Sequence, residues 1–225
     1  MATVSSRRPP RKVVYPTSDG KPMAETDDHH DLMVELIETQ KAHFASEPNI
    51  YVSGNLLMYY VRGNPRRHVS PDVFVVHGVK KKSRLKYYAT WEQQGKGPDF
   101  VVEMTSRSTR KEDTEKKFRL YQDVLHVAEY FLFDPFAEYL KPPLQGYRLK
   151  RGRYVRIKSV GGRLPSEVTG LHLERHGEEL RLYDPTHKLW LPNPEETKAK
   201  LEASEAENAR LRQELEALRR ASGQS

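Results

Sequence analysis

The chain has no cysteine, no long apolar run and a modest share of hydrophobic side chains among its 225 residues. Without cysteine it cannot form a disulfide framework, a thiolate zinc site, an iron–sulfur cluster or a cysteine nucleophile, so only carboxylates or histidines could hold a metal. It contains no stretch of about 18 apolar residues and no apolar signal core, so we expect a soluble cytoplasmic protein without a membrane span. Hydrophobic residues make up 36% and charged residues 31%, which indicates one ordinary domain diluted by solvated segments.

The formal net charge is +7, and the charged residues are unevenly distributed. Residues 1–20 contain four basic side chains, one acidic side chain and three prolines, a composition that predicts a flexible basic arm. Residues 195–225 contain six basic and seven acidic side chains, so the rest of the basic excess lies in 21–194. This excess favours a polyanionic partner such as nucleic acid, although basic proteins without such a partner are common.

Residues 21–194 show the element pattern of a single α/β domain. Apolar residues at helical spacing predict a helix over 27–44. Thr109 followed by Glu112 has the spacing of a capping box and predicts a second helix that ends near residue 125. Short apolar runs predict three strands in an antiparallel meander and then two further strands, at 50–52, 56–61, 73–76, 100–104 and 130–133. Two polar strands are expected within 147–158, and the core should end near Trp190.

The tail over 195–225 has a heptad pattern. Alternating steps of three and four place the a and d positions at Leu201, Ser204, Asn208, Leu211, Leu215 and Leu218. This pattern predicts a short coiled coil and therefore a homodimer. Serine and asparagine in the seam weaken such a dimer, so a frayed single helix is the alternative interpretation.

Glu103 interrupts the apolar run at 100–104. An unpaired buried carboxylate costs several kcal/mol, so this side chain needs a partner. Side chains alternate along a strand, so the neighbours of Glu103 face the core while Glu103 and Thr105 share the opposite face. Asp72 directly precedes the 73–76 strand and would meet Glu103 if the two strands are neighbours. Two such carboxylates suit Mg²⁺, which keeps several waters and takes its remaining ligands from a phosphate.

The helix after this strand supplies a cation. Asp113, Lys117 and Tyr121 are four residues apart and lie on one helical face, close in sequence to Glu103. Lys117 would then orient an attacking water or neutralise the scissile phosphate. The same spacing also suits an ordinary surface salt bridge between Asp113 and Lys117, with Tyr121 as a packing residue.

A basic cluster with adjoining aromatic residues predicts a nucleic-acid contact. Basic side chains pair with phosphates and aromatic rings stack on bases. A solvated loop that leads into an apolar anchor is the alternative. The basic residues are Lys80, Lys81, Lys82, Arg84 and Lys86, and Tyr87, Tyr88 and Trp91 follow them.

The same residues carry a resemblance to a known family. The segments SPDVFVV (70–76), GPDFVVEMTSRST (97–109) and EYFLFDP (129–135), together with Lys117 and Tyr121, resemble the Uma-type family of putative restriction endonucleases. That family belongs to the PD-(D/E)XK nuclease superfamily. The resemblance implies a restriction-endonuclease-like α/β fold, with a mixed central sheet flanked by helices. A coiled-coil tail after the domain also fits members of the family.

The resemblance also implies roles for particular residues. Asp72 and Glu103 would be the metal ligands. In the superfamily the lysine normally stands two residues after the glutamate, where this chain has Thr105. Uma-type sequences instead supply the lysine from the following helix, and Lys117 occupies the matching position.

Other residues would support this site. His30 resembles the histidine at the start of the first helix in this family, although His29 is adjacent. Thr105, Ser106, Asp113 and Tyr121 complete the expected supporting set. Structural alternatives remain open: Asp72 follows a proline, where an aspartate is common in turns, and Ser106 lies where serine or threonine is common at helix starts.

We therefore expect a domain over 21–194 that hydrolyses phosphodiester bonds in DNA, using Mg²⁺, with Mn²⁺ as an alternative. Asp72, Glu103 and Lys117 would be its catalytic residues. The second hypothesis is a catalytically silent nuclease fold that only binds nucleic acid. The third is an interaction protein whose active element is the coiled coil.

Overall fold

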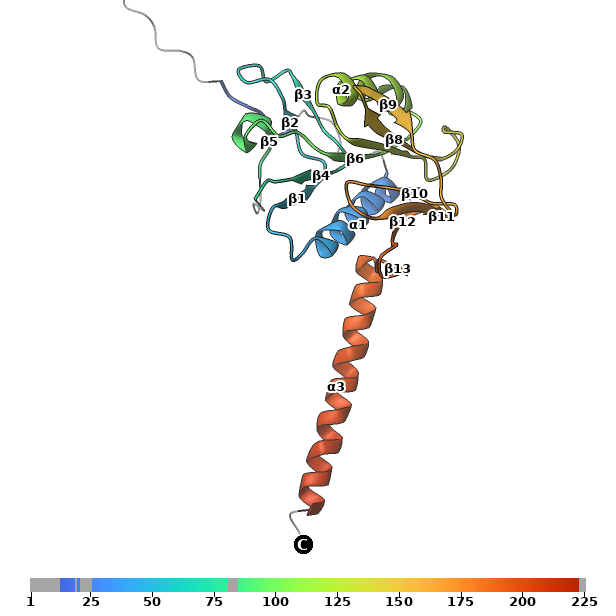
Figure 1. The fold of residues 1–225 in the computed structure, drawn as a ribbon. Helices are drawn as coiled ribbons and strands as arrows, with labels where there is room; N and C mark the ends of the chain where they lie inside the picture. The colour runs from blue at the N-terminus through green and yellow to red at the C-terminus, as the bar shows by residue number, and fades with distance from the viewer. Residues whose placement is uncertain (1–12, 19, 21–25, 81–84, 223–225) are drawn as a thin grey trace, which may run out of the picture.

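The computed structural model describes residues 13–18, 20, 26–80 and 85–222. It contains the helices α1 (Asp27–His43), α2 (Phe118–Asp123) and α3 (Pro194–Ser222), the 3₁₀ helix η1 (Thr90–Gln93) and the π-helix η2 (Glu112–Lys117). A compact domain contains all of these except α3, which projects away from it (Figure 1). Within the described ranges, no helix is both long enough and apolar enough to cross a membrane.

A six-stranded mixed sheet forms the centre of the domain. Its only parallel pair among the described strands is β6 with β7, and the crossover between these two strands carries η2 and α2. All the other neighbours in this sheet are antiparallel. The predicted mixed α/β class is therefore confirmed. The strand order is β1 (Ile50–Ser53), β4 (Val73–His77), β6 (Phe100–Met104), β7 (Glu129–Phe133), β8 (Leu144–Lys150) and β9 (Arg153–Arg156).

Both faces of this sheet are covered. Phe100, Val102 and Met104 pack with α1 and with a second sheet on one face, whereas Val101 packs with Tyr121 of α2 on the other face. The predicted alternation along β6 is therefore present. The second sheet, which the sequence patterns did not predict, consists of β10 (Leu164–Pro165), β11 (His172–His176), β12 (Glu179–Asp184) and β13 (Leu189–Trp190).

The predicted meander of the first three strands is wrong. β1 pairs directly with β4, and the run at 56–61 leaves the central sheet for a three-stranded sheet of β3 (His68–Val69), β2 (Met58–Tyr59) and β5 (Tyr88–Ala89). The chain turns away at Gly54, where an added Cβ would lie 1.9 Å from the carbonyl oxygen of Asp72. Asn55 follows with a positive φ of 49° and donates its N–H to the carbonyl of Pro71. This close approach holds β2 beside the segment that carries Asp72.

The described part of the N-terminal arm contacts the small sheet. The Tyr15 ring lies 5.0 Å from the Tyr59 ring and 5.2 Å from the Trp91 ring, measured between centroids. The Tyr59 hydroxyl donates a hydrogen bond of 2.6 Å to the carbonyl of Pro16. Residues 13–18 are thus attached to the domain rather than free as predicted, because aromatic burial offsets the entropy lost on ordering them. Residues 1–12 of the predicted arm lie outside the described residues.

The helix α3 is anchored where it leaves the domain. Asn193 and Glu196 form a reciprocal cap, in which the Glu196 N–H donates to Asn193 Oδ1 and the Asn193 N–H donates to Glu196 Oε2. Arg181 of β12 also lies 2.8 Å from Glu196 Oε2. The direction of the helix is therefore coupled to the second sheet, and the predicted tail helix is present.

Candidate active site

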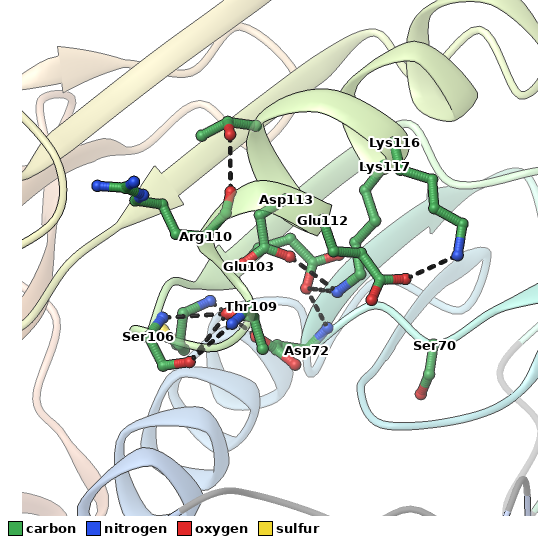
Figure 2. Close-up of polar contacts among 12 residues, drawn as sticks. Ser70, Asp72, Glu103, Ser106, Thr109, Arg110, Glu112, Asp113, Lys116 and Lys117 are labelled. Atoms are coloured by element: carbon green, nitrogen blue, oxygen red, sulfur yellow. Dashed lines mark hydrogen bonds and ion pairs between the residues drawn. The ribbon is translucent and has the colours of Figure 1, made fainter.

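Asp72 and Glu103 meet at one end of the central sheet. β4 and β6 are antiparallel neighbours with Val73 opposite Val102, so the residue before β4 lies beside Glu103 of β6. The Asp72 N–H donates to Glu103 Oε2 at 3.3 Å, and the Met104 N–H donates to Asp72 Oδ2 at 2.7 Å. The two carboxylates that sequence reasoning selected are therefore held side by side (Figure 2).

Lys117 lies among three carboxylates. Its Nζ is 2.8 Å from Glu103 Oε2 and 3.1 Å from Asp113 Oδ1, and its side chain is 13% exposed. The Tyr121 hydroxyl donates to the other Glu103 oxygen, Oε1, at 2.6 Å. The predicted face of Asp113, Lys117 and Tyr121 is thus directed at Glu103, whose carboxylate is held at both oxygens. Figure 2 shows Asp113 and Lys117 beside Glu103.

The start of this helix differs from the predicted capping box. The Thr109 side chain pairs with Ser106 instead: the Thr109 N–H donates to Ser106 Oγ and the Ser106 N–H donates to Thr109 Oγ1. The Arg110 N–H donates to the Ser106 carbonyl in the turn before the helix, and the Asp113 N–H donates to the Thr109 carbonyl. The helix itself begins at Arg110, directly after Thr109, as predicted.

A π-helical segment then carries Asp113 and Lys117. Such wide turns are rare and are frequently found at functional sites. Here the buried Tyr130 hydroxyl of β7 donates to the Asp113 carbonyl at 3.0 Å. The contact ties the π-helix to the sheet and fixes the position from which Lys117 reaches Glu103.

Burial and neighbouring charges shift the pKa values of the acidic side chains and of Lys117 in different directions. Burial raises the pKa of Glu103 well above its usual range, and Asp72 and Asp113 add to this effect although Lys117 opposes it. Burial would also raise the pKa of Asp72, but hydrogen bonding to His29 and the charge of Lys117 outweigh it, so the pKa is lowered. Burial disfavours the charged form of Lys117, yet the three carboxylates outweigh it and raise its pKa well above the usual value.

His29, not His30, faces the acids. His29 Nε2 lies 3.4 Å from Asp72 Oδ2 and its side chain is 12% exposed, whereas His30 is 45% exposed and contacts Asp31 through Nδ1. The expectation for His30 is therefore corrected to its neighbour. Thr26 caps α1 by accepting from the His29 N–H, and this cap determines which side of the first turn faces the sheet.

Thr105 and Ser106 differ in their surroundings. Thr105 is 2% exposed, and its hydroxyl finds no hydrogen-bond partner among the described residues. Its N–H donates to the Phe133 carbonyl at 2.6 Å. The Ser106 hydroxyl pairs with the Thr109 hydroxyl. Neither contacts Glu103 directly, so their supporting roles stay predictions.

The arrangement fits a hard divalent cation with few protein ligands. Within 13–18, 20, 26–80 and 85–222, no group of three or more histidine and acidic side chains is placed to hold a metal. Mg²⁺ uses one or two carboxylates and completes its shell with water and phosphate, so Asp72 and Glu103 are residues that could hold it. Three carboxylates against one lysine also leave an excess of negative charge for a cation to balance.

Lys80, a described residue of the basic cluster predicted to bind nucleic acid, lies away from the acids. Lys80 follows the far end of β4, a strand of five residues that spans about 16 Å. Lys80 and Lys86 are exposed, and Lys81, Lys82 and Arg84 lie outside the described residues. A second exposed basic set, which was not predicted from the sequence, follows Glu103 by a few residues. It consists of Arg107, Arg110 and Lys111. Their signal was the run of basic residues beside the predicted capping motif.

Two comparisons with known proteins found matches. A model of the Uma2 family, described as "Putative restriction endonuclease", matches residues 6–182. A crystal structure from Anabaena variabilis ATCC 29413, described as a putative nuclease belonging to DUF820, is 16% identical, covers 70% of this chain and 85% of that chain, and has a TM-score of 0.45. No curated protein matches the chain. Because the family model matches residues 6–182, more than half of the chain, the chain belongs to the Uma2 family of putative restriction endonucleases.

Proposed function

We propose that this member of a nuclease family is a metal-dependent endonuclease that hydrolyses phosphodiester bonds in DNA. The observation that carries the proposal is the convergence of Asp72, Glu103 and Lys117 from two strands and a π-helix, with Lys117 Nζ 2.8 Å from Glu103. All three residues are polar, and Asp72 is 31 residues from Glu103 in the sequence while Lys117 is 14 residues from it. Their joint burial at a sheet end costs stability that a purely structural site would not need.

Asp72 and Glu103 would hold the metal, Mg²⁺ or alternatively Mn²⁺. A bound divalent ion stabilises the charge on a phosphoryl group and lowers the pKa of a coordinated water. Tyr121 keeps Glu103 oriented through Oε1, and His29 keeps Asp72 oriented through Oδ2. Both carboxylates therefore enter the reaction already positioned.

Lys117 acts as a fixed positive charge and hydrogen-bond donor. The surrounding carboxylates keep it protonated, so it is unsuited to remove a proton from water. We assign it to orienting the attacking water or neutralising the developing negative charge on the phosphate. It would act from Nζ, the atom that contacts Glu103 and Asp113.

The DNA backbone would approach over the start of the crossover between β6 and β7. Arg107 is exposed in the turn after the strand that carries Glu103, and Arg110 and Lys111 are exposed at the start of the helix that follows. Their side chains are suited to phosphates and would place the scissile bond near the acids. The cluster around Lys80 and Lys86 would then contact DNA farther from the cleavage point.

A second candidate is a binding module that has lost cleavage. Thr105 stands at the position where the superfamily pattern, as the resemblance implies, normally has its lysine. Such a protein would bind DNA in a salt-dependent manner and leave it intact with every divalent metal. The two candidates differ only in the chemistry at Glu103 and Lys117.

Nicking of supercoiled plasmid in Mg²⁺ or Mn²⁺ separates them. We expect cleavage by the wild type, loss of about 10²-fold or more in Lys117→Ala, and full activity in the matched control Lys116→Ala. Lys116 lies next to Lys117 on the same π-helix but is 79% exposed and pairs with Glu112. Equal cleavage in all three proteins would refute the proposed site. Salt-dependent binding without cleavage by the wild type would favour the binding module.

We also propose that the protein works as a homodimer through α3. A second copy would bring two active sites together, an arrangement that suits cutting both strands of a duplex. The exposed leucines of α3 support this association.

A further inference from the structure

The apolar side of α3 is exposed along its length. The four leucines of this 29-residue helix are each about half exposed or more. Leu201 is 58%, Leu211 49%, Leu215 50% and Leu218 68% exposed. They occupy only the a and d positions of the heptad pattern. α3 contacts α1 near the domain, and the rest of the helix extends away from it (Figure 1). A stripe of this kind needs a partner to be buried.

The charges beside this stripe match a second copy of the same helix in one orientation. In a parallel pair with equal register, each g side chain faces the e side chain of the next heptad in the other chain. With Leu201 at an a position, every complete g–e pair joins opposite charges. The pairs are Lys200 with Glu205, Glu207 with Arg212, and Glu214 with Arg219.

The seam residues favour the same orientation. In a parallel pair Asn208 faces Asn208 of the other copy, and the two amides can satisfy each other within the seam. In an antiparallel pair that aligns Leu201 with Leu218, Asn208 would face Leu211 and lose its partner. That alignment would also bring Glu207 close to Glu214 of the other copy, where like charges repel.

We infer that α3 pairs with α3 of a second copy, parallel and in register, with Asn208 facing Asn208. Both domains then lie at the same end of the coiled coil. Because the cap at Asn193 and the Arg181–Glu196 ion pair anchor the helix, the pairing also restricts the relative orientation of the domains. Leu201 is seven residues after Pro194, so the seam begins about 10 Å from the start of the helix. The inference does not depend on what chemistry the domain performs.

The absence of cysteine in the chain allows a direct test. Ser204→Cys is nearly isosteric and lies at a d position, so in the inferred dimer it would face its own copy within disulfide range, with Cα atoms about 4–7 Å apart. In the antiparallel pair the same residues would be about 16 Å apart along the helix. Ala206→Cys, on the outer face of the same turn, is the matched control. Each full-length variant is oxidised with oxidised glutathione and its cross-linking measured on a denaturing gel.

We expect a dimer by sedimentation equilibrium and at least tenfold more cross-linking of Ser204→Cys than of Ala206→Cys.

We also expect self-association to depend on the charges at the e and g positions. The double variant Arg212→Glu with Arg219→Glu should weaken self-association about tenfold or more, and so should the double variant Glu207→Arg with Glu214→Arg. Mixing these two double variants should restore the dimer. A monomer at every concentration up to about 200 μM, equal cross-linking of both cysteine variants, or a dimer that Ser204→Cys fails to cross-link would each overturn the inference.

Discussion

Two buried glutamates stand on neighbouring parallel strands and have different surroundings. Glu103 of β6 is 0% exposed and Glu129 of β7 is 1% exposed. Glu129 accepts hydrogen bonds from Arg148 Nε, the Ser166 hydroxyl and the Glu167 N–H. These contacts join the central sheet to the loop between β10 and β11 of the second sheet. The Glu129 carboxylate is therefore balanced by an arginine and neutral donors.

Glu103 is balanced differently. Its lysine is shared with Asp113, and Asp72 is close enough to raise its pKa further. Two additional acids thus compete for one cation, whereas the second acid beside Arg148, Glu167, is 73% exposed and solvated. Burial alone does not mark a catalytic carboxylate. The difference lies in whether the protein supplies enough positive charge, and at Glu103 it does not.

The largest expected effect is on cleavage activity, which should depend on Glu103 and not on Glu129. Glu103→Gln should reduce plasmid cleavage about 10³-fold, because the amide cannot replace a carboxylate that holds a divalent ion. Its free energy of unfolding should change by no more than about 1 kcal/mol, since Asp113 still pairs with Lys117. Cleavage rates and urea unfolding of the same preparations would show this. The control is Glu115→Gln, which changes an exposed glutamate on the π-helix that carries Asp113 and Lys117. Unimpaired cleavage by Glu103→Gln would contradict the comparison.

Stability should respond at the other glutamate. Glu129→Gln leaves Arg148 without its buried charge partner and should cost about 3 kcal/mol, which lowers the melting temperature by about 6–12 °C. Cleavage per folded molecule should be kept. Glu167→Gln changes the exposed partner of the same arginine and should cost less than about 0.5 kcal/mol. Calorimetry of both variants tests the difference, and equal destabilisation would remove it.

The pH dependence of stability should also distinguish Glu103. Its pKa in the folded state is raised above the usual 4.5, so the folded protein holds this proton more tightly than the unfolded chain does. The associated stabilisation is complete at low pH and is lost as pH rises through the raised pKa. Relative to Glu103→Gln, the wild type should therefore lose stability above about pH 4.5, by at most about 1.4 kcal/mol per pH unit. Denaturant unfolding at a series of pH values would measure it, and parallel pH profiles would argue against the raised pKa.

The smallest expected effect concerns the two histidines. Hydrogen bonding to His29 helps to lower the pKa of Asp72, so His29→Ala should raise that pKa and move the acidic limb of the pH–rate profile upward. Cleavage at neutral pH should fall only several-fold. His30→Ala, which changes an exposed neighbour, should leave the profile unchanged. A shift in His30→Ala but not in His29→Ala would reverse the assignment.

Much of the site was predictable because its signals are local. A charged residue inside an apolar strand identified Glu103, and a spacing of four placed Asp113, Lys117 and Tyr121 on one face. The π-helix was not predictable, because it depends on the contact between Tyr130 and the Asp113 carbonyl from another strand. Whether His29 or His30 faces the acids depends on how α1 is rotated against the sheet, and the sequence pattern did not determine which of the two adjacent histidines it is.

The fold divides in the same way. The sequence by itself determined the first helix, the apolar strands and the heptad tail, since periodic burial is written in consecutive residues. Only the tertiary structure decided that β1 pairs with β4, that β2 joins a separate sheet, and that β10–β13 form a sheet of their own. Strands of two residues carry no periodicity, so long-range packing selects their partners. The convergence of Asp72, Glu103 and Lys117 belongs to this second class, because strand pairing alone brings distant carboxylates to one end of a sheet.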